Sequence, residues 1–322
     1  MNRSAPRSID QYLRQLREEL AGADSALIQD ALYDAEEYLR AEVAAHPDKS
    51  ESDVLELIAS TYGAPDEVAS AYRDTEVKVK AAMATPRKEA HSPLGKFFGV
   101  FLDPRTYTSF FFMLLGLPRG IIYFVLAIAG LSLSAGFSVL IIGVPFFLMF
   151  TAICRVVSLA EGRLIEAMTG VRMPRRPVYQ GKALGFWARI GEMLKDPRTW
   201  TTIAYLILML PIGILYFVIA IAGFSVSLSL IALPIVGVLA RAGWFGLGGV
   251  EVFSTAQPEW AFNTGLGIPI LGLAGLLLLT SLMHLARGVG RLHAMFAKSM
   301  LVARTASSAA DAAQSGAALP AH

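Results

Sequence analysis

Long stretches almost free of charged side chains constrain this fold more than any other feature of the sequence. Residues 108–153 carry a single charged side chain, that of Arg119. A helix that crosses a bilayer needs about 20 mainly apolar residues, so this stretch alone is long enough for two. The sequence therefore predicts transmembrane helices, and a wholly soluble enzyme is excluded.

The apolar region is an internal duplication with a spacing of 93 residues. Residues 103–107 (Asp-Pro-Arg-Thr-Tyr) align with residues 196–200 (Asp-Pro-Arg-Thr-Trp). Residues 118–130 align in the same register with residues 211–223, and most of these positions are identical or similar. Chance does not supply so many identities in one register, so we interpret the region as two copies of one unit.

Each unit has enough apolar sequence for two spans. In the first unit we expect spans near residues 118–136 and 138–157, preceded by a short interfacial helix near 105–116. In the second we expect spans near 210–232 and 264–285. The prolines within these stretches permit kinks or re-entrant segments.

The position of Arg119 decides where the first span begins. A span that starts at Phe110 places Arg119 deep in lipid, at a cost of about 3 kcal/mol. A start at Pro118 leaves the guanidinium able to reach the lipid headgroups, and we prefer that boundary.

Lysine and arginine residues predict the orientation, because they accumulate in cytoplasmic loops. Residues 155–198, between the two units, contain nine of them, whereas the turn at 131–138 has no charged residue. The connection near 236–262 contains one arginine and is expected outside. We therefore expect four spans in the bacterial inner membrane, parallel repeats, and cytoplasmic N and C termini.

The first 76 residues have a different character: 17 acidic and 7 basic side chains give a net charge of −10, against +12 for the remainder. Apolar side chains three and four positions apart predict four short helices. Ser8 and Asp24 are suited to cap the first two, Ser50 or Ser52 the third, and Pro65 to begin the fourth. Each apolar stripe is too small to be stable alone, so we expect a compact bundle.

The acidic side chains of the second helix have two interpretations. They form either a docking surface for a basic partner or an ordinary solvated face. The residues concerned are Asp30, Asp34, Glu36, Glu37 and Glu42.

The expected architecture is thus all-α, with a small cytoplasmic helical bundle and a four-helix transmembrane domain built from two parallel repeats. The expected parts are the bundle (1–76), a basic linker (77–102), the first repeat (103–195), the second repeat (196–304) and a disordered tail (305–322).

The bundle resembles a known family. Residues 57–69 read Leu-Ile-Ala-Ser-Thr-Tyr-Gly-Ala-Pro-Asp-Glu-Val-Ala, and their Gly-x-Pro-x-x-Val-Ala pattern is similar to that of the HAAS-type helical domain. This domain occurs at the N-terminus of bacterial membrane proteins and is often associated with PadR-type transcription regulators. The resemblance implies a PadR-type partner for residues 8–75. Direct contact with nucleic acid is not expected, because the basic residues flank apolar runs and suit the lipid bilayer.

Residues 97–304 resemble the membrane sensor domain found ahead of histidine kinases. The likeness rests on the Asp-Pro-Arg-Thr-Tyr/Trp start of each unit, on the Leu-Pro-x-Gly-x-x-Tyr-Phe-Val span, and on Glu161 with Arg163 and Leu164. It implies a sensor module. The sequence contains no kinase domain, phosphoacceptor motif or nucleotide-binding glycine loop, so we expect the output to pass through the bundle or a separate polypeptide.

Candidate sensing residues lie in the outer connection and near the end of the last span. They are Trp244, Glu251, Phe253, Trp260 and His284. The outer aromatic side chains suit a ligand site or interfacial anchoring. An ionisable side chain within a membrane is a functional candidate, and the alternative for His284 is a neutral ring hydrogen-bonded between helices.

Arg119 and Glu161 are further candidates, as intramembrane or interfacial charges that would pair if their helices meet. Cys154 is expected to pack as a small apolar residue. We find no catalytic motif, and the five histidines and the acidic side chains have no metal-ligand spacing. We therefore expect no enzymatic activity, no metal and no cofactor.

The leading hypothesis is a non-catalytic sensor that relays an envelope or membrane signal through the bundle to a partner regulator. The alternatives are a transporter of small molecules or lipids and a membrane scaffold without a ligand. Four spans make a thin bundle, and a homodimer is compatible with that.

Overall fold

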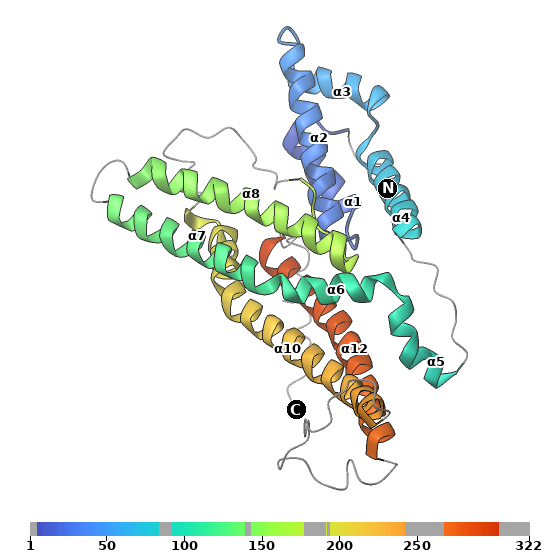
Figure 1. The fold of residues 1–322 in the computed structure, drawn as a ribbon. Coiled ribbons are helices and arrows are strands. Elements are labelled where there is room, and N and C mark those ends of the chain that lie inside the picture. The colour runs from blue at the N-terminus through green and yellow to red at the C-terminus, as the bar shows by residue number, and fades with distance from the viewer. Residues whose placement is uncertain are drawn as a thin grey trace, which may run out of the picture. The chain divides into compact units, whose positions relative to one another are not determined.

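The computed structural model describes residues 5–83, 92–138, 143–176, 191, 194–241 and 267–302 (Figure 1). Within these residues every regular element is helical, which confirms the all-α prediction. The chain forms two compact units. One consists of residues 1–86, 127–205 and 294–322, and the other of residues 87–126 and 206–293.

The N-terminal bundle contains α1 (Ile9–Glu19), α2 (Ser25–Ala45), α3 (Glu51–Thr61) and α4 (Pro65–Met83). Three helices begin at the predicted caps. The side chains of Ser8, Asp24 and Ser50 accept the backbone N–H groups of Gln11, Ala26 and Asp53. These bonds satisfy amides that the first helical turn leaves without a partner. Helix α4 continues to Met83, beyond the predicted boundary at residue 76.

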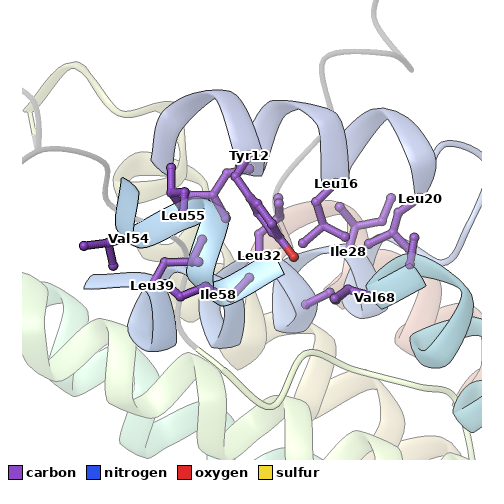
Figure 2. Packing of buried hydrophobic residues seen from close by; sticks show 14 residues of the cluster. Tyr12, Leu16, Leu20, Ile28, Leu32, Leu39, Val54, Leu55, Ile58 and Val68 are labelled. Atoms are coloured by element: carbon purple, nitrogen blue, oxygen red, sulfur yellow. The ribbon is translucent and has the colours of Figure 1, made fainter. Parts of the chain in front are cut away.

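The core of the bundle is formed by apolar side chains from all four helices (Figure 2). Tyr12, Leu16 and Leu39 are at most 2% exposed. Tyr12 also donates its hydroxyl to the carbonyl of Gly63, at 2.8 Å. Gly63 has a φ of 106°, which favours glycine, and Pro65 then begins α4. This geometry explains the Gly-x-Pro pattern as a sharp turn between two helices.

Four helices of the remaining chain are long and apolar enough to cross a membrane, considering the described residues only. They are α7 (Gly116–Phe137), α8 (Gly143–Thr169), α10 (Pro197–Arg241) and α12 (Gly267–Leu301). The predicted span near 118–136 agrees with α7. Helices α8 and α12 continue beyond the predicted spans near 138–157 and 264–285, into sequence that carries charged residues.

Three shorter helical segments precede α7. They are α5 (Pro93–Phe98), the 3₁₀ helix η1 (Gly99–Leu102) and α6 (Pro104–Leu114). The two repeats differ here, because α6 and α7 are separate helices whereas α10 runs unbroken through Pro211. Arg119 lies beside the interruption between α6 and α7. Its guanidinium donates to the carbonyls of Leu115 and Phe112 at the end of α6, and the matching position of the second repeat is an isoleucine.

The aligned motifs make the same local hydrogen bonds 93 residues apart. Asp103 accepts the N–H of Arg105, and Asp196 accepts the N–H of Arg198, each at 3.0 Å. The aromatic residue of each motif donates to the carbonyl six residues before it: Tyr107 to Phe101 and Trp200 to Leu194, each at 2.9 Å. Each Asp-Pro-Arg-Thr-Tyr/Trp sequence therefore forms a capped helix start closed by an aromatic side chain.

Glycines allow α7 and α10 to approach closely. A Cβ atom placed on Gly116 would lie 3.2 Å from the Cα atom of Gly213, and one placed on Gly120 would lie 2.5 Å from the carbonyl oxygen of Met209. Gly213 and Met209 are the repeat equivalents of Gly120 and Gly116, so the contact is reciprocal. Small residues at such a crossing let the two backbones pack directly.

Candidate functional site: the bundle and the arginine segment

Helix α8 is followed by a short segment of irregular structure that carries three arginines. Gly170, with a φ of 73°, ends the helix in a backbone conformation that favours glycine. Residues 171–176, Val-Arg-Met-Pro-Arg-Arg, form what we call the arginine segment. Met173 is 1% exposed and lies beside Gly162 of α8, so the segment also packs against its own helix.

Helix α2 of the bundle binds the backbone of the arginine segment. Asp30 Oδ1 accepts the N–H groups of Arg175 and Arg176, at 2.8 and 2.9 Å. Gln29 Nε2 donates to the carbonyl of Arg176, at 2.7 Å. Gln29 and Asp30 are only 6% and 5% exposed, so these polar groups are buried and satisfied by the segment.

The bundle also binds two arginine side chains of the segment. Arg172 lies between Asp30 and Glu76, with 3.2 Å between its Nη2 and Asp30 Oδ2, and its Nη1 pairs with Glu76 Oε2. Arg176 Nε lies 2.8 Å from Asp34 Oδ1. Helices α2 and α4 together therefore supply three carboxylates to two guanidinium groups.

The neighbourhood of Asp34 is held by aromatic side chains. Tyr72 donates its hydroxyl to Asp34 Oδ2 at 3.0 Å, and the guanidinium of Arg176 lies 5.7 Å from the ring centre of Tyr33. Burial, and then the Asp34 carboxylate, raise the pKa of the Tyr72 hydroxyl, so it remains a proton donor.

Burial raises the pKa of Asp30, although the two backbone N–H groups and Arg172 act in the opposite direction. Desolvation therefore outweighs the attraction that the carboxylate receives. A buried ion pair of this kind adds little net stability, but removing one partner leaves an uncompensated charge.

A second ion pair joins the bundle to the end of α12. Lys298 Nζ lies 2.7 and 2.6 Å from the two carboxylate oxygens of Asp24, the residue that caps α2. Asp30 and Asp24 thus connect one helix of the bundle to the chain that follows α8 and to the last turns of α12. The segment after α8 and the last turns of α12 therefore both contact the bundle.

The acidic residues of α2 divide between the two expected roles. Asp30 and Asp34 bind the arginine segment, as a docking surface would, but the occupant belongs to the same chain. Glu36 is buried, at 9% exposure, and pairs with Arg40 of its own helix, whereas Glu37 is exposed, as expected of an ordinary solvated face.

Glu161 and Arg119 are both buried, at 1% and 8% exposure. Glu161 accepts the hydroxyl of Tyr205 at 2.9 Å. Arg119 lies over the ring of Phe112, 4.1 Å from its centre. The two candidates belong to different units, and their mutual pairing stays a prediction.

His284 is engaged by the short helix α5. Its Nε2 lies 2.9 Å from the carbonyl oxygen of Phe97, and the two rings are stacked with 5.4 Å between their centres. This is the hydrogen-bonded arrangement that we gave as the alternative to sensing. The other candidate sensing residues, Trp244, Glu251, Phe253 and Trp260, lie outside the described residues.

Sequence reasoning missed the contact of Asp30 with Arg172 and Arg176. The arginines entered the prediction only as evidence for orientation. The opposite net charges of the first 76 residues and the remainder of the chain were the available signal for this contact. Net charge alone does not identify individual partners about 140 residues apart in the chain. His293 was also missed: it is 1% exposed, with its Nδ1 3.4 Å from the Tyr216 hydroxyl.

A comparison with family models matches residues 112–301 to the family described as "Putative sensor". The chain belongs to this family. The match covers most of both predicted repeats, and the bundle lies outside it. It supports the sensor part of the predicted architecture, and with the four apolar helices it indicates a membrane protein with a sensor role. Neither the curated proteins nor the solved structures contain a match.

Proposed function

We propose that this sensor-family protein is a non-catalytic signalling protein of the bacterial inner membrane. It passes a change in its membrane helices to the N-terminal bundle, and the bundle passes it to a partner regulator. The observation that carries the proposal is the binding of the arginine segment by Asp30, because that segment continues directly from the membrane helix α8.

The contact is suited to transmission because it includes the backbone. When α8 tilts or rotates, Gly170 and the arginine segment move with its end. Asp30 and Gln29 hold the segment at two N–H groups and one carbonyl, so a displacement pulls on α2 or breaks the contact. A ligand or membrane condition that favours one arrangement of α8 shifts the population of the protein toward that arrangement.

The basic residues support the orientation that this function needs. Nine lysines and arginines at residues 155–198 favour a cytoplasmic position for that region, the arginine segment included. The bundle then lies in the cytoplasm, where a PadR-type regulator would meet it, as the HAAS-like pattern around Gly63 suggests. In this proposal the protein does not contact nucleic acid itself, and a homodimer is compatible with it.

The polar side chains within the spans give little support to a transporter. Ser134, Thr151, Ser227 and Thr280 are buried, and each donates its hydroxyl to a carbonyl three or four residues earlier in its own helix. Such hydroxyls are satisfied within the helix and offer a solute little along a path. A sensor that moves helices needs no such path.

The experiment that tests the proposal is affinity purification of the tagged protein in mild detergent, followed by mass spectrometry. A variant without residues 1–76 serves as the control for the bundle. We expect a cytosolic DNA-binding regulator with the full-length protein and not with the control. Full recovery of the same partners by both proteins would contradict a role of the bundle in output.

A further inference from the structure

The bundle binds the arginine segment in the manner of a peptide receptor. One carboxylate oxygen of Asp30 accepts two consecutive N–H groups, and Gln29 donates to the next carbonyl. The side chains of Arg172 and Arg176, four residues apart, each meet a carboxylate of the bundle. The groups that the bundle contacts in this way all belong to a short irregular segment with two arginines at this spacing.

The same bundle face would be strongly acidic if the segment left it. Asp30, Glu76 and Gln29 are at most 6% exposed with the segment in place, and Asp34 is also paired with it. On release, three carboxylates and an amide would lie together in water with their former partners gone. A ligand of the same chemistry would regain those charge-assisted hydrogen bonds.

We propose that the arginine segment is an internal competitor for this face, formed by Gln29, Asp30, Asp34 and Glu76, and that in the released state the face binds an arginine-bearing extended segment of a partner protein. The inference rests on the proposed function and specifies its output surface. Attachment to the same chain gives the internal competitor an effective concentration of about a millimolar. A partner therefore gains access mainly when a change in α8 withdraws the segment.

The test uses the full-length protein in nanodiscs of zwitterionic lipid and a fluorescent peptide with the sequence of residues 170–177, Gly-Val-Arg-Met-Pro-Arg-Arg-Pro. Binding is followed by fluorescence anisotropy. The wild type should bind the peptide weakly. The double variant Arg172→Ala/Arg176→Ala, whose own segment has lost both guanidinium contacts and keeps only its backbone hydrogen bonds to Asp30 and Gln29, should bind it at least about tenfold more tightly, the effect of about 1.4 kcal/mol of lost competition.

Two controls show whether the bundle face is responsible. Adding Asp30→Asn and Glu76→Gln to the double variant should remove the gain. A peptide with lysine at the three arginine positions has the same charge but lacks the planar guanidinium fork, and it should bind several-fold more weakly. Equal binding of the peptide by the wild type and the double variant would overturn the proposal, as would a gain that survives the added substitutions.

A measurement on the wild type alone covers the case in which the double variant does not fold. Excess peptide should accelerate hydrogen exchange of the amides of residues 171–173, 175 and 176 by displacing the segment, and unchanged exchange at saturating peptide would overturn the proposal. If the double variant instead gains affinity for vesicles of anionic lipid and none for the peptide, the segment competes for lipid and the proposal is wrong. Failure here, together with a partner captured only through the bundle, would leave the proposed function standing with another output surface.

Discussion

Asp30 and Arg172 are 142 positions apart in the chain, and their side chains form a buried ion pair with 3.2 Å between Oδ2 and Nη2. Asp30 lies in the N-terminal bundle, whereas Arg172 lies three residues beyond the end of a membrane helix. The pair therefore joins the N-terminal bundle to the segment that follows one of the four long apolar helices. Its side chains are 7% and 14% exposed, which makes it sensitive to the loss of either partner.

Arg172→Ala should destabilise the bundle strongly. It leaves the Asp30 and Glu76 carboxylates buried without their shared counter-ion, and the loss of one partner from a buried pair costs about 3 kcal/mol. Hydrogen exchange of the α2 amides measures this free energy. The matched control is Arg175→Ala, because the Arg175 side chain is half-exposed and pairs with Glu166 of α8; it should cost less than about 1 kcal/mol. Equal effects of the two substitutions would contradict the assignment.

Acidification should strengthen the contact at Asp30. Because burial raises the pKa of this carboxyl, the bound state holds its proton more tightly than the released state does. The contribution of Asp30 is full below the ordinary aspartate pKa and is lost as the pH rises through the raised value. As the pH is lowered from about 7 to about 4, the ordinary range of an aspartate carboxyl, the wild type should therefore gain stability relative to Asp30→Asn. Thermal unfolding of both proteins at the two pH values isolates Asp30, since the other groups titrate in both. If the wild type instead loses stability relative to Asp30→Asn on acidification, the prediction is wrong.

The two equivalent helix caps should differ in strength. Asp196→Ala removes a cap and should cost about 1 kcal/mol. Asp103→Ala should cost more, because Asp103 also pairs with Arg287 of α12, with 3.1 Å between Oδ2 and Nη2. Asp103→Asn keeps a capping oxygen and should lose only the ion-pair part. The stabilities of the three variants are compared by the temperature at which the buried Cys154 thiol becomes reactive during thermal unfolding in detergent. Equal losses of stability in the two alanine variants would show that the ion pair between Asp103 and Arg287 adds no stability.

The crossing of α7 and α10 should tolerate no added methyl group. Gly120→Ala would place a Cβ atom 2.5 Å from the carbonyl oxygen of Met209, so the helices must separate. We expect a loss of about 2 kcal/mol. Gly288→Ala is the control, because nothing lies within 4 Å of its Cβ position in α12, and there alanine should stabilise the helix by about 0.5 kcal/mol. A neutral Gly120→Ala in the same thiol assay would argue against a close crossing.

The local structure of this chain could be predicted because it depends on neighbouring residues. Ser8, Asp24 and Ser50 cap helices as their positions indicated, and Pro65 begins α4. These are short-range effects of side-chain oxygens on free amides. The apolar stretches predicted the four long helices for a similar reason.

The full length of α8 and the binding of the arginine segment to the bundle could not be predicted from neighbouring residues. Helix α8 continues past the apolar stretch to Thr169. Outside that stretch the helix depends on its backbone hydrogen bonds, and residues with polar side chains form these as well as apolar ones do. The choice of Arg172 as the partner of Asp30 depends on tertiary distance. Residues 155–198 contain nine lysines and arginines, and nothing in the sequence pattern indicates which of them pairs with Asp30.

The most direct measurement of the central claim is hydrogen exchange at the amides of Arg175 and Arg176 in the full-length protein in nanodiscs. Both amides lie in a segment without regular structure and are bound by Asp30 Oδ1. The account predicts slow exchange in the wild type and an acceleration of at least about tenfold in Asp30→Ala, equivalent to about 1.4 kcal/mol. Fast exchange in the wild type, or equal rates in the two proteins, would show that the bundle does not hold the segment and would contradict the relay.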